Sequence, residues 1–381
     1  MRIVLIGNYL PDKQESMQRF AHMLEKGFRQ AGFASELWVP GTLFGRGVGT
    51  TTAGIGKWLG YLDKWVVFPL LLRWRRFGIT ASQAETYFHI CDHSNAPYLN
   101  HLPLRRTSIT CHDVLAIRGG LGHADAYVPT SRLGRKLQAW ILSSLSKSEK
   151  IAAVSQLTLG QLEALAPFAN NDRKDWRVIH NAFNADFYPM QAEQAQAQLD
   201  RIGFRSATPF LLHVGSGLAR KNRLLLLDMA ILAGEKWQGN ICYAGEAIDS
   251  VLLQHADSLG LRARIVSVAK PDHATLVALY STCAAFVFPS YSEGFGWPVI
   301  EAQACGAPVI ASDVAPMPEV SGDAALHADP ANAQQFADAF MSLESSAVRD
   351  ALIQQGFANC QRFERQHMIA AYLDLLALSH S

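Results

Sequence analysis

The residues best suited to chemistry lie in a glycine-containing loop in the last third of the chain. A short apolar run over Ala284–Phe288 predicts a buried strand, and the helix predicted over Pro298–Ala304 opens on a proline, which suits the first turn. Between these elements, Gly294 and Gly296 leave backbone amides uncovered at a helix N-terminus, where the helix dipole also attracts negative charge. The loop is therefore a predicted binding site for a phosphate group.

Two carboxylates flank the glycines of this loop, Glu293 before them and Glu301 near the end of the first helical turn. Carboxylates beside a phosphate would repel it unless they bind hydroxyl-rich groups on either side of it, such as a sugar and a ribose. The arrangement therefore indicates a nucleotide-sugar site. Spacing alone leaves an alternative open, in which Glu301 is an acid favoured by the helix dipole and Glu293 is a solvated loop residue.

The amino-acid sequence of the loop is more specific than the spacing of its carboxylates. Ser290–Glu301 closely resembles the Glu-x7-Glu signature of the retaining glycosyltransferases of family 4, and the similarity continues through residues 306–312 and 318–326. The resemblance implies an α/β protein of GT-B architecture, in which two Rossmann-like domains face each other across a cleft. It also implies that Glu293 holds sugar hydroxyls, that Glu301 holds the ribose diol, and that the donor site includes Phe295.

A second phosphate-binding feature opens the C-terminal half of the chain. Gly215 and Gly217 follow a predicted strand and lead into Arg220 and Lys221, whose guanidinium and ammonium groups can together neutralise a diphosphate. An Arg-Lys pair alone is usually a solvated turn, but the resemblance aligns this pair with the one that binds the donor diphosphate in family 4. It also places the loop after Val268 against the nucleobase.

Polar residues follow several predicted strands of the N-terminal half, where ligands of open α/β sheets bind. The resemblance places His112 where family-4 enzymes have a histidine that contacts the donor sugar. No run has the helical i, i+4 histidine pair of a zinc hydrolase, so no metal is expected. The residues expected to border the acceptor side of the cleft are Asn8, Asp92, His93, Asp113 and Asn181.

Length and composition allow two domains of ordinary size. The chain has 381 residues, of which 49% are hydrophobic, and its net charge of +1 argues against a nucleic-acid-binding protein. Six cysteines without a Cys-x-x-Cys pair are expected to be reduced core residues. We expect an acceptor domain over residues 1–185, a donor domain over 186–365 that begins with a linker over 186–205, and a helix over 366–381 that returns to the first domain.

The segment Lys57–Phe77 combines tryptophans and other apolar residues with five basic residues. No uninterrupted run reaches the roughly 20 apolar residues needed to span a bilayer. The segment is either a basic amphipathic helix on an anionic membrane surface, or a helix pair packed on the N-terminal sheet. Because Met1–Gly7 runs directly into a strand pattern without a signal peptide, we expect a cytoplasmic protein, peripheral on the inner membrane face under the first alternative.

The resemblance implies an enzyme of bacterial polysaccharide or lipopolysaccharide biosynthesis. It would transfer a hexose or deoxyhexose, with mannose as the first guess, from a GDP- or UDP-linked donor to a hydroxyl of a glycan or lipid-linked acceptor, with retention at the anomeric carbon. Without a metal or other cofactor, Glu293, His112, Arg220 and Lys221 would act in catalysis. The alternatives are a nucleotide-sugar epimerase or phosphorylase on the same scaffold, and a catalytically silent nucleotide-binding subunit.

Overall fold

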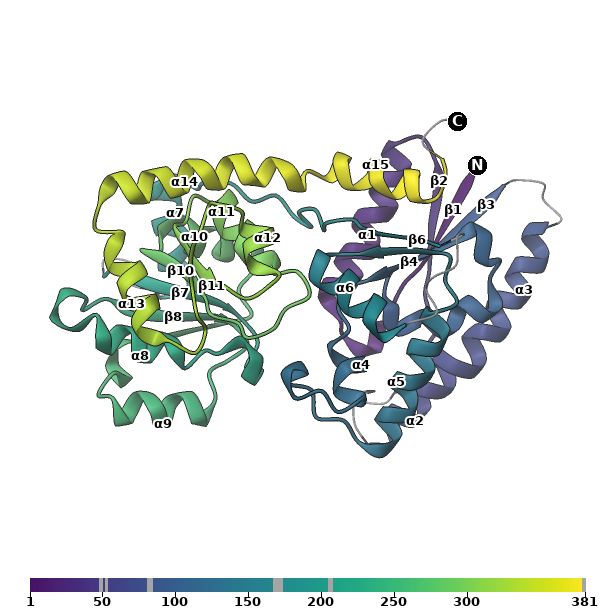
Figure 1. The fold of residues 1–381 in the computed structure, drawn as a ribbon, viewed down its shortest axis with the longest axis horizontal. Helices are drawn as coiled ribbons and strands as arrows, with labels where there is room; N and C mark the ends of the chain where they lie inside the picture. Colours follow the sequence, from purple (N-terminus) through teal and green to yellow (C-terminus); the bar gives the residue numbers. More distant parts are fainter. Residues whose placement is uncertain (48–50, 52–53, 81–84, 167–173, 205–207, 379–381) are drawn as a thin grey trace. The chain divides into compact units, whose positions relative to one another are not determined.

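The computed structural model describes residues 1–47, 51, 54–80, 85–166, 174–204 and 208–378, with the side chains at 77, 79 and 80 excepted (Figure 1). Of the helix expected at the C-terminus, residues 379–381 lie outside the described residues. The chain divides into two compact units. The N-terminal unit comprises residues 1–184 and those from 365 onward, and the C-terminal unit comprises residues 185–364.

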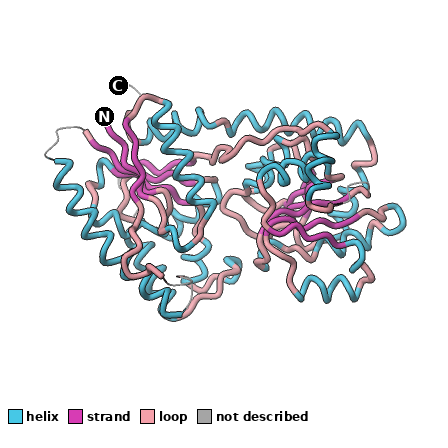
Figure 2. The backbone as a smooth tube through the Cα atoms, turned by 180° about the vertical axis from the view of Figure 1, so that it is seen from behind, coloured by secondary structure: helices cyan, strands magenta, loops and turns pink. Residues whose placement is uncertain are grey.

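The N-terminal unit is built on a six-stranded parallel sheet in the order β2-β1-β3-β4-β5-β6. Its four central strands are mostly buried because helices cover both faces, whereas the edge strands β2 and β6 are only partly buried (Figure 2). The strand order reverses between β1 and β3, so the carboxyl ends of these two strands form a ligand-binding crevice in folds of this type. The strands are β1 (Arg2–Ile6), β2 (Ala34–Trp38), β3 (Thr86–Ile90), β4 (Thr107–Cys111), β5 (Lys150–Ala153) and β6 (Asp175–Val178).

The C-terminal unit has a second six-stranded parallel sheet, in the order β12-β11-β10-β7-β8-β9. Read from the other edge, this is the Rossmann order 3-2-1-4-5-6, and its reversal lies between β7 and β10. The strands are β7 (Phe210–Gly215), β8 (Asn240–Gly245), β9 (Ile265–Ala269), β10 (Ala285–Phe288), β11 (Val309–Ser312) and β12 (Leu326–Ala328).

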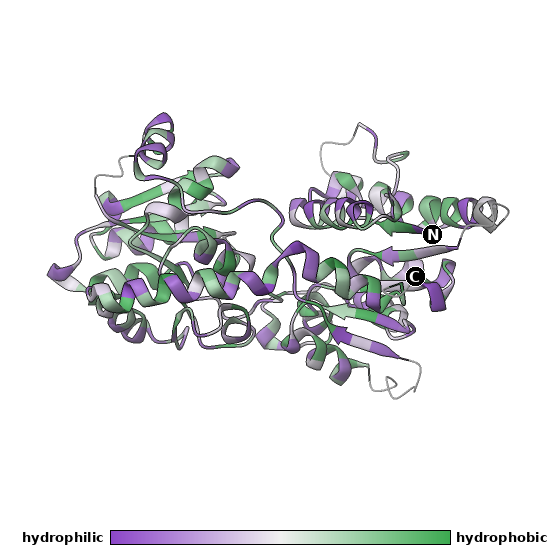
Figure 3. Cartoon of the chain, turned by 90° about the horizontal axis from the view of Figure 1, so that it is seen from above, coloured by the Kyte–Doolittle hydropathy of each residue, from purple (hydrophilic) through white to green (hydrophobic). Residues whose placement is uncertain are grey.

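Helices connect the strands of both sheets, and in some of them, such as α1, hydrophilic and hydrophobic residues lie along opposite faces (Figure 3). Those of the N-terminal unit are α1 (Glu15–Gln30), α2 (Gly54–Leu62), α3 (Phe68–Thr80), α4 (Leu115–Gly120), α5 (Arg132–Leu145), α6 (Gln156–Leu165) and α15 (Arg365–Leu375). Those of the C-terminal unit are α7 (Ala192–Arg201), α8 (Leu225–Leu232), α9 (Ser250–Ser258), α10 (His273–Thr282), α11 (Trp297–Ala304), α12 (Met317–Ser321), α13 (Ala333–Ser342) and α14 (Ser346–Cys360). Within the described residues, every helix is too short or too polar to cross a bilayer.

The last helix, α15, packs on the sheet and α1 of the N-terminal unit. Tyr372 hydrogen-bonds through its hydroxyl to Oγ1 of Thr110 at 2.8 Å, and Thr110 in turn lies 2.9 Å from Nε2 of the buried His89. Ile369 lies so close to Gly27 that a Cβ on this glycine would be 2.3 Å from its Cδ1. A glycine on α1 therefore permits the close approach of α15.

The prediction of a linker over residues 186–205 is wrong over half of that stretch. Residues Ala192–Arg201 form α7, which packs against α10 through the buried Ala195 and Leu199. The polar composition of the stretch indicates a linker, but alanine and glutamine are good helix formers, and two apolar residues four positions apart suffice to attach one helical face. The expected reduced cysteines are confirmed, since all six are free thiols.

Residues 54–80 form one helical segment, in which the π-helix η2 (Asp63–Val67) joins α2 to α3. One face packs on the N-terminal unit through Phe68, Leu72 and Trp65, whose ring lies 5.4 Å from that of Tyr98. The other face is apolar and between 41% and 79% exposed. The exposed residues of this face, which we call the apolar stripe, are Ile55, Trp58, Leu62, Val66, Leu70 and Trp74.

Asp63 begins the π-helix and is fully buried. Its carboxylate accepts hydrogen bonds from the hydroxyl of Tyr9 at 2.7 Å and from the backbone N–H groups of Leu43, Phe44 and Gly45 at 2.9–3.2 Å. Burial opposes its ionisation, but these hydrogen bonds hold the pKa of the Asp63 carboxyl below its usual range. The aspartate therefore attaches the loop after β2 to the helical segment.

Candidate functional site

The two loops that the sequence singles out lie side by side at the carboxyl edge of the C-terminal sheet. One follows β7 and carries Arg220 and Lys221, and the other follows β10 and carries Glu293. The backbone N–H of Tyr291 donates to the carbonyl oxygen of Arg220 over 2.8 Å, which joins the loops. Because the strand order reverses between β7 and β10, this is where a doubly wound sheet binds its ligand.

Glu293 is held between the two cations of the other loop. Its Oε1 accepts from Nζ of Lys221 at 2.5 Å, and its Oε2 lies 2.8 Å from Nη1 of Arg220. The same Nη1 donates to the carbonyl oxygen of Ser292 at 2.7 Å. Burial opposes ionisation of Glu293, but the charges of Lys221 and Arg220 outweigh it and hold the pKa of this carboxyl below its usual range. Glu293 is thus an ionised counter-ion for the two cations.

The second carboxylate, Glu301, lies on α11 and is 8% exposed. Tyr280 of α10 donates its hydroxyl to Oε2 of Glu301 at 3.0 Å. The helix begins after Gly296, whose φ of +103° favours glycine, and a Cβ at this position would lie 2.6 Å from Cε of Met317. The open helix N-terminus that the sequence predicts therefore depends on this glycine.

The other predicted donor residues support the two loops. Phe295, between Gly294 and Gly296, is buried and packs edge-on against Trp297 and Phe363, with ring centroids 6.0 and 5.7 Å away. Its side chain therefore anchors the loop from inside.

In the β7 loop, a Cβ on Gly217 would be crowded, whereas a Cβ on Gly215 would make an ordinary contact. A Cβ on Gly215 would lie 3.4 Å from Nε2 of His213, and a Cβ on Gly217 would lie 2.8 Å from an Nη of Arg223. The N–H of Gly217 donates to the carboxylate of Glu246 at 2.7 Å. Val268 lies on β9, two strands from β7, and is half-buried.

His213 is a residue at this edge that the motif analysis missed. It lies on β7 and is fully buried. Its Nδ1 is hydrogen-bonded to the carbonyl oxygen of Val287 at 3.1 Å, while its Nε2 has no hydrogen-bond partner among the described residues. Burial lowers the pKa of His213 to about 3, so the ring is neutral. The hydroxyls of Ser290 and Ser312, at the ends of β10 and β11, are also buried without a partner in the described chain. The sequence signal that could have identified His213 is a single histidine inside an otherwise apolar strand.

At the corresponding edge of the N-terminal sheet, the structure brings Asn8 and Asp92 together. Nδ2 of Asn8 donates to Oδ2 of Asp92 at 2.6 Å, and Nδ2 of Asn95 donates to Oδ1 of Asn8 at 2.9 Å. His93 lies 3.4 Å from the same aspartate, through Nδ1. These residues follow β1 and β3, between which the strand order reverses. They therefore form a buried polar cluster in the predicted crevice.

The remaining predicted residues of this unit have separate surroundings. Nε2 of His112 lies 2.9 Å from the carbonyl oxygen of Cys91, and burial lowers the pKa of the imidazole. Asp113 accepts the N–H of Leu115 at 2.9 Å and so fixes the start of α4. Asn181 is buried, and its amide has no hydrogen-bond partner within the described residues. Among the described side chains, no group of three or more His, Cys, Asp or Glu is arranged to hold a metal ion.

Comparison with known proteins shows which sequences this chain resembles. Residues 195–358 match the family described as glycosyl transferases group 1. The chain is 28% identical over 273 residues to O-antigen chain mannosyltransferase B from Escherichia coli, a match that covers 70% of this chain and 68% of that protein. It is 26% identical over 227 residues to the serotype-specific mannosyltransferase WbdA from Escherichia coli, which is 57% of this chain and about a quarter (26%) of that relative.

Among solved structures, sucrose-phosphate synthase from Thermosynechococcus elongatus superposes with a TM-score of 0.71 and 20% sequence identity. The superposition covers 99% of this chain and 98% of that one. At this identity the similarity shows the fold. It confirms the GT-B fold class predicted from the sequence, with a Rossmann-like sheet in each unit.

Proposed function

We propose that this chain is a glycosyltransferase that transfers one hexose or deoxyhexose with retention at the anomeric carbon. The match of residues 195–358 to the glycosyl transferases group 1 family supports the transferase assignment. The donor is a nucleoside diphosphate sugar, with mannose as the first candidate sugar, since two relatives are described as mannosyltransferases. The acceptor is a hydroxyl of a glycan or of a lipid-linked saccharide. The O-antigen activity described for the first relative supports an acceptor of this kind.

The observation that carries the proposal is the ion cluster of Glu293 with Arg220 and Lys221 near the start of α11. A diphosphate offers the same cations a second anionic partner. In the proposed complex the diphosphate takes over Arg220 and Lys221, and Glu293 turns toward the sugar hydroxyls. The two cations and the loop amides then stabilise the charge that grows on the leaving nucleoside diphosphate, without a divalent metal.

The other end of the donor is assigned to Glu301. Its carboxylate binds the two ribose hydroxyls, and the hydrogen bond from Tyr280 sets the direction in which it points. The nucleobase, guanine or uracil, lies near the loop after Val268. His112, whose lowered pKa keeps it neutral, is assigned a hydrogen bond to a hydroxyl of the donor sugar.

Acceptor recognition is assigned to the polar cluster of the N-terminal unit. Asn8, Asp92 and His93 supply donors and acceptors that match saccharide hydroxyls, and the lowered pKa of Asp92 keeps its carboxylate ionised. Burial opposes this ionisation, and the neighbouring His93 and the hydrogen bonds from Asn8 and from the N–H of Ser94 outweigh it. The apolar stripe would rest on an anionic membrane surface, where a lipid-linked acceptor is presented.

Transfer assays with labelled donors test the proposal directly. The purified chain is incubated with GDP-mannose, UDP-glucose or UDP-N-acetylglucosamine and with lipid-linked or free oligosaccharide acceptors. The expected product carries the sugar with the same anomeric configuration as the donor, read from one-bond C–H coupling by NMR. An inverted product would overturn the retaining assignment, and donor interconversion without an acceptor would point to an epimerase.

A further inference from the structure

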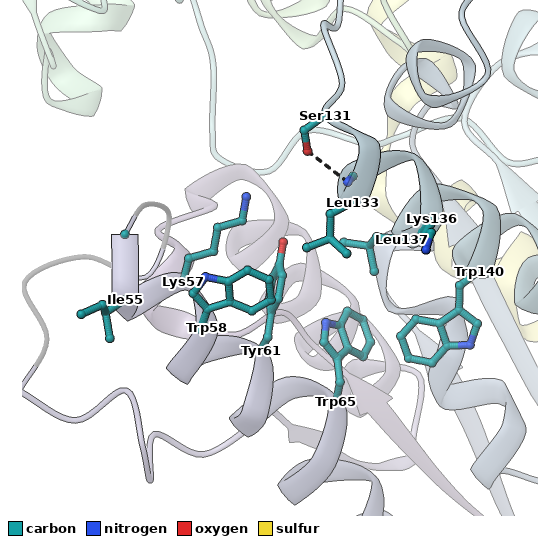
Figure 4. Close-up of a pocket in the computed structure, with 12 residues that line it drawn as sticks. Ile55, Lys57, Trp58, Tyr61, Trp65, Ser131, Leu133, Lys136, Leu137 and Trp140 are labelled. Atoms are coloured by element: carbon teal, nitrogen blue, oxygen red, sulfur yellow. Dashed lines mark hydrogen bonds between the residues drawn. The ribbon is translucent and has the colours of Figure 1, made fainter.

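A groove in the N-terminal unit lies between α2 with its π-helical extension and the helix α5 (Figure 4). Its volume is about 700 Å³, which falls within the range of sites for small organic ligands. Trp58, Tyr61 and Trp65 line one wall. Leu133, Leu137 and Trp140 line the other. The groove therefore offers two facing apolar walls.

The aromatic rings of the groove form a fixed frame. Trp58 and Tyr61 meet edge-on with centroids 5.9 Å apart, and Trp65 meets Trp140 edge-on at 5.2 Å across the two helices. Leu133, 50% exposed, projects into the space between the walls (Figure 4). Such walls suit a flexible hydrocarbon chain, which needs apolar area and few directed hydrogen bonds.

The rim of the groove is positively charged. Lys57 and Lys136 belong to the lining, and Arg132 and Arg135 stand exposed on α5. No aspartate or glutamate occurs in residues 54–62 or 131–147. The charge of this rim is therefore complementary to an anionic head group and unsuited to a cationic one.

The groove is also continuous with the apolar stripe, because Ile55 and Trp58 belong to both. We propose that the groove binds the hydrocarbon chain of a phosphate-bearing lipid, with the phosphate at Lys57 and Lys136. The lipid is the anchor of the acceptor, an identity that rests on the proposed function, whereas the binding itself does not. A chain leaving the membrane along the stripe would enter the groove without crossing water.

Soluble single-chain amphiphiles test the binding below their micelle concentrations. Titration calorimetry compares dodecyl phosphate with octyl phosphate, with the uncharged dodecyl maltoside and with inorganic phosphate. We expect dodecyl phosphate to bind at least about tenfold more tightly than either of the other amphiphiles, because both the added CH₂ groups and the phosphate are bound. Inorganic phosphate should bind weakly. Equal affinity of the three amphiphiles would overturn the proposal.

Matched variants locate the binding site. Leu133→Asp puts a charge into the groove, whereas Leu70→Asp changes a leucine of similar exposure on the stripe outside it. We expect Leu133→Asp to weaken the binding of dodecyl phosphate at least about tenfold, and Leu70→Asp to change this affinity by no more than about twofold. Lys136→Glu should weaken dodecyl phosphate, unlike Lys26→Glu on α1. Equal effects within each pair would overturn the proposed site.

A second titration separates this proposal from the proposed function. Each variant is also titrated with a nucleoside diphosphate, for which all should retain the affinity of the unchanged protein if their fold is intact. Loss of dodecyl phosphate binding with retained nucleotide binding supports the groove. If the unchanged protein binds dodecyl phosphate but none of the donors, the result supports lipid binding in the groove and contradicts the donor assignment.

Discussion

Nζ of Lys221 lies 2.5 Å from Oε1 of Glu293, and both residues are less than one-tenth exposed. Removing Lys221 would leave the buried Glu293 with one cation, Arg220, in place of two. We therefore expect Lys221→Met to lower the free energy of unfolding by less than the about 3–5 kcal/mol that a fully unpaired buried charge costs, and the double variant Lys221→Met/Glu293→Gln to lose less still. Denaturant titration followed by circular dichroism measures both. A single variant as stable as the unchanged protein would show that solvent reaches the pair.

The two buried histidines His89 and His213 should make the protein sensitive to mild acid. Burial lowers the pKa of each to about 3, and the neighbouring His112 adds to the shift of His89. The unfolded chain, with a histidine pKa of about 6.5, takes up these protons first. Stability is then complete above about pH 6.5 and falls as the pH is lowered toward 3.

The slope of this loss is on the order of 1 kcal/mol per pH unit for each histidine. His213→Leu should therefore lose less stability than the unchanged protein between pH 6.5 and 4, whatever its stability at neutral pH. Urea titrations at half-unit pH steps provide the comparison. Parallel curves for the two proteins would mean that His213 takes up its proton equally in the folded and in the unfolded chain.

Replacing Glu293 and replacing Glu301 should affect the binding of different ligands. Glu301→Ala should weaken both the nucleoside diphosphate and the sugar donor by more than about tenfold, since both contain ribose. Glu293→Ala should reduce turnover and the extra affinity that the sugar provides. Tyr280→Phe removes only the hydrogen bond to Glu301, so its effect should be smaller than that of Glu301→Ala. Calorimetry measures the affinity of each variant for both ligands. Equal and weak effects of all the substitutions on both affinities would contradict the assignment of this loop to the donor site.

Activity should persist in excess EDTA. The proposed neutralisation of the diphosphate by Arg220 and Lys221 takes the place of a divalent ion. Initial transfer rates are compared after EDTA treatment and after readdition of magnesium or manganese. A rate abolished by EDTA and restored by either ion would contradict the assignment.

The apolar stripe should carry the attachment to membranes. Leu70→Glu/Trp74→Glu replaces two of its residues that are 60% and 73% exposed, so the fold should persist. We expect the unchanged protein to float with vesicles containing phosphatidylglycerol and the variant to remain in the dense fraction. High salt should weaken flotation of the unchanged protein in part, because the apolar contribution is not screened. Equal flotation of both proteins would place the membrane contact elsewhere.

The strands and the loop between β10 and α11 could be predicted because their signals are local. Parallel strands covered on both faces read as apolar runs, so β10, expected over Ala284–Phe288, is observed over Ala285–Phe288. The helix expected over Pro298–Ala304 begins one residue earlier, at Trp297. Proline and glycine mark its ends because their backbone preferences act on the nearest residues alone.

What could not be predicted depends on contacts between distant parts of the chain. The ion pair of Lys221 and Glu293 joins residues 72 positions apart, and nothing in either local pattern indicates that the predicted diphosphate ligands are already paired. The strand β12, Leu326–Ala328, has three residues and is fixed by pairing with β11, so its own sequence carries little signal. The linker prediction failed because α7 is held by α10, about 80 positions later.

The attachment made by Asp63 has an evolutionary consequence. Because the carboxylate binds main-chain N–H groups, which every residue except proline provides, it is indifferent to the identity of Leu43 and Phe44, whose side chains are 63% and 48% exposed. Gly45 has no such freedom, since a Cβ there would lie 2.2 Å from the hydroxyl of Tyr9. Two adjacent positions can thus drift toward new partners while the loop keeps its shape, and they are the natural places to diversify in a library of variants.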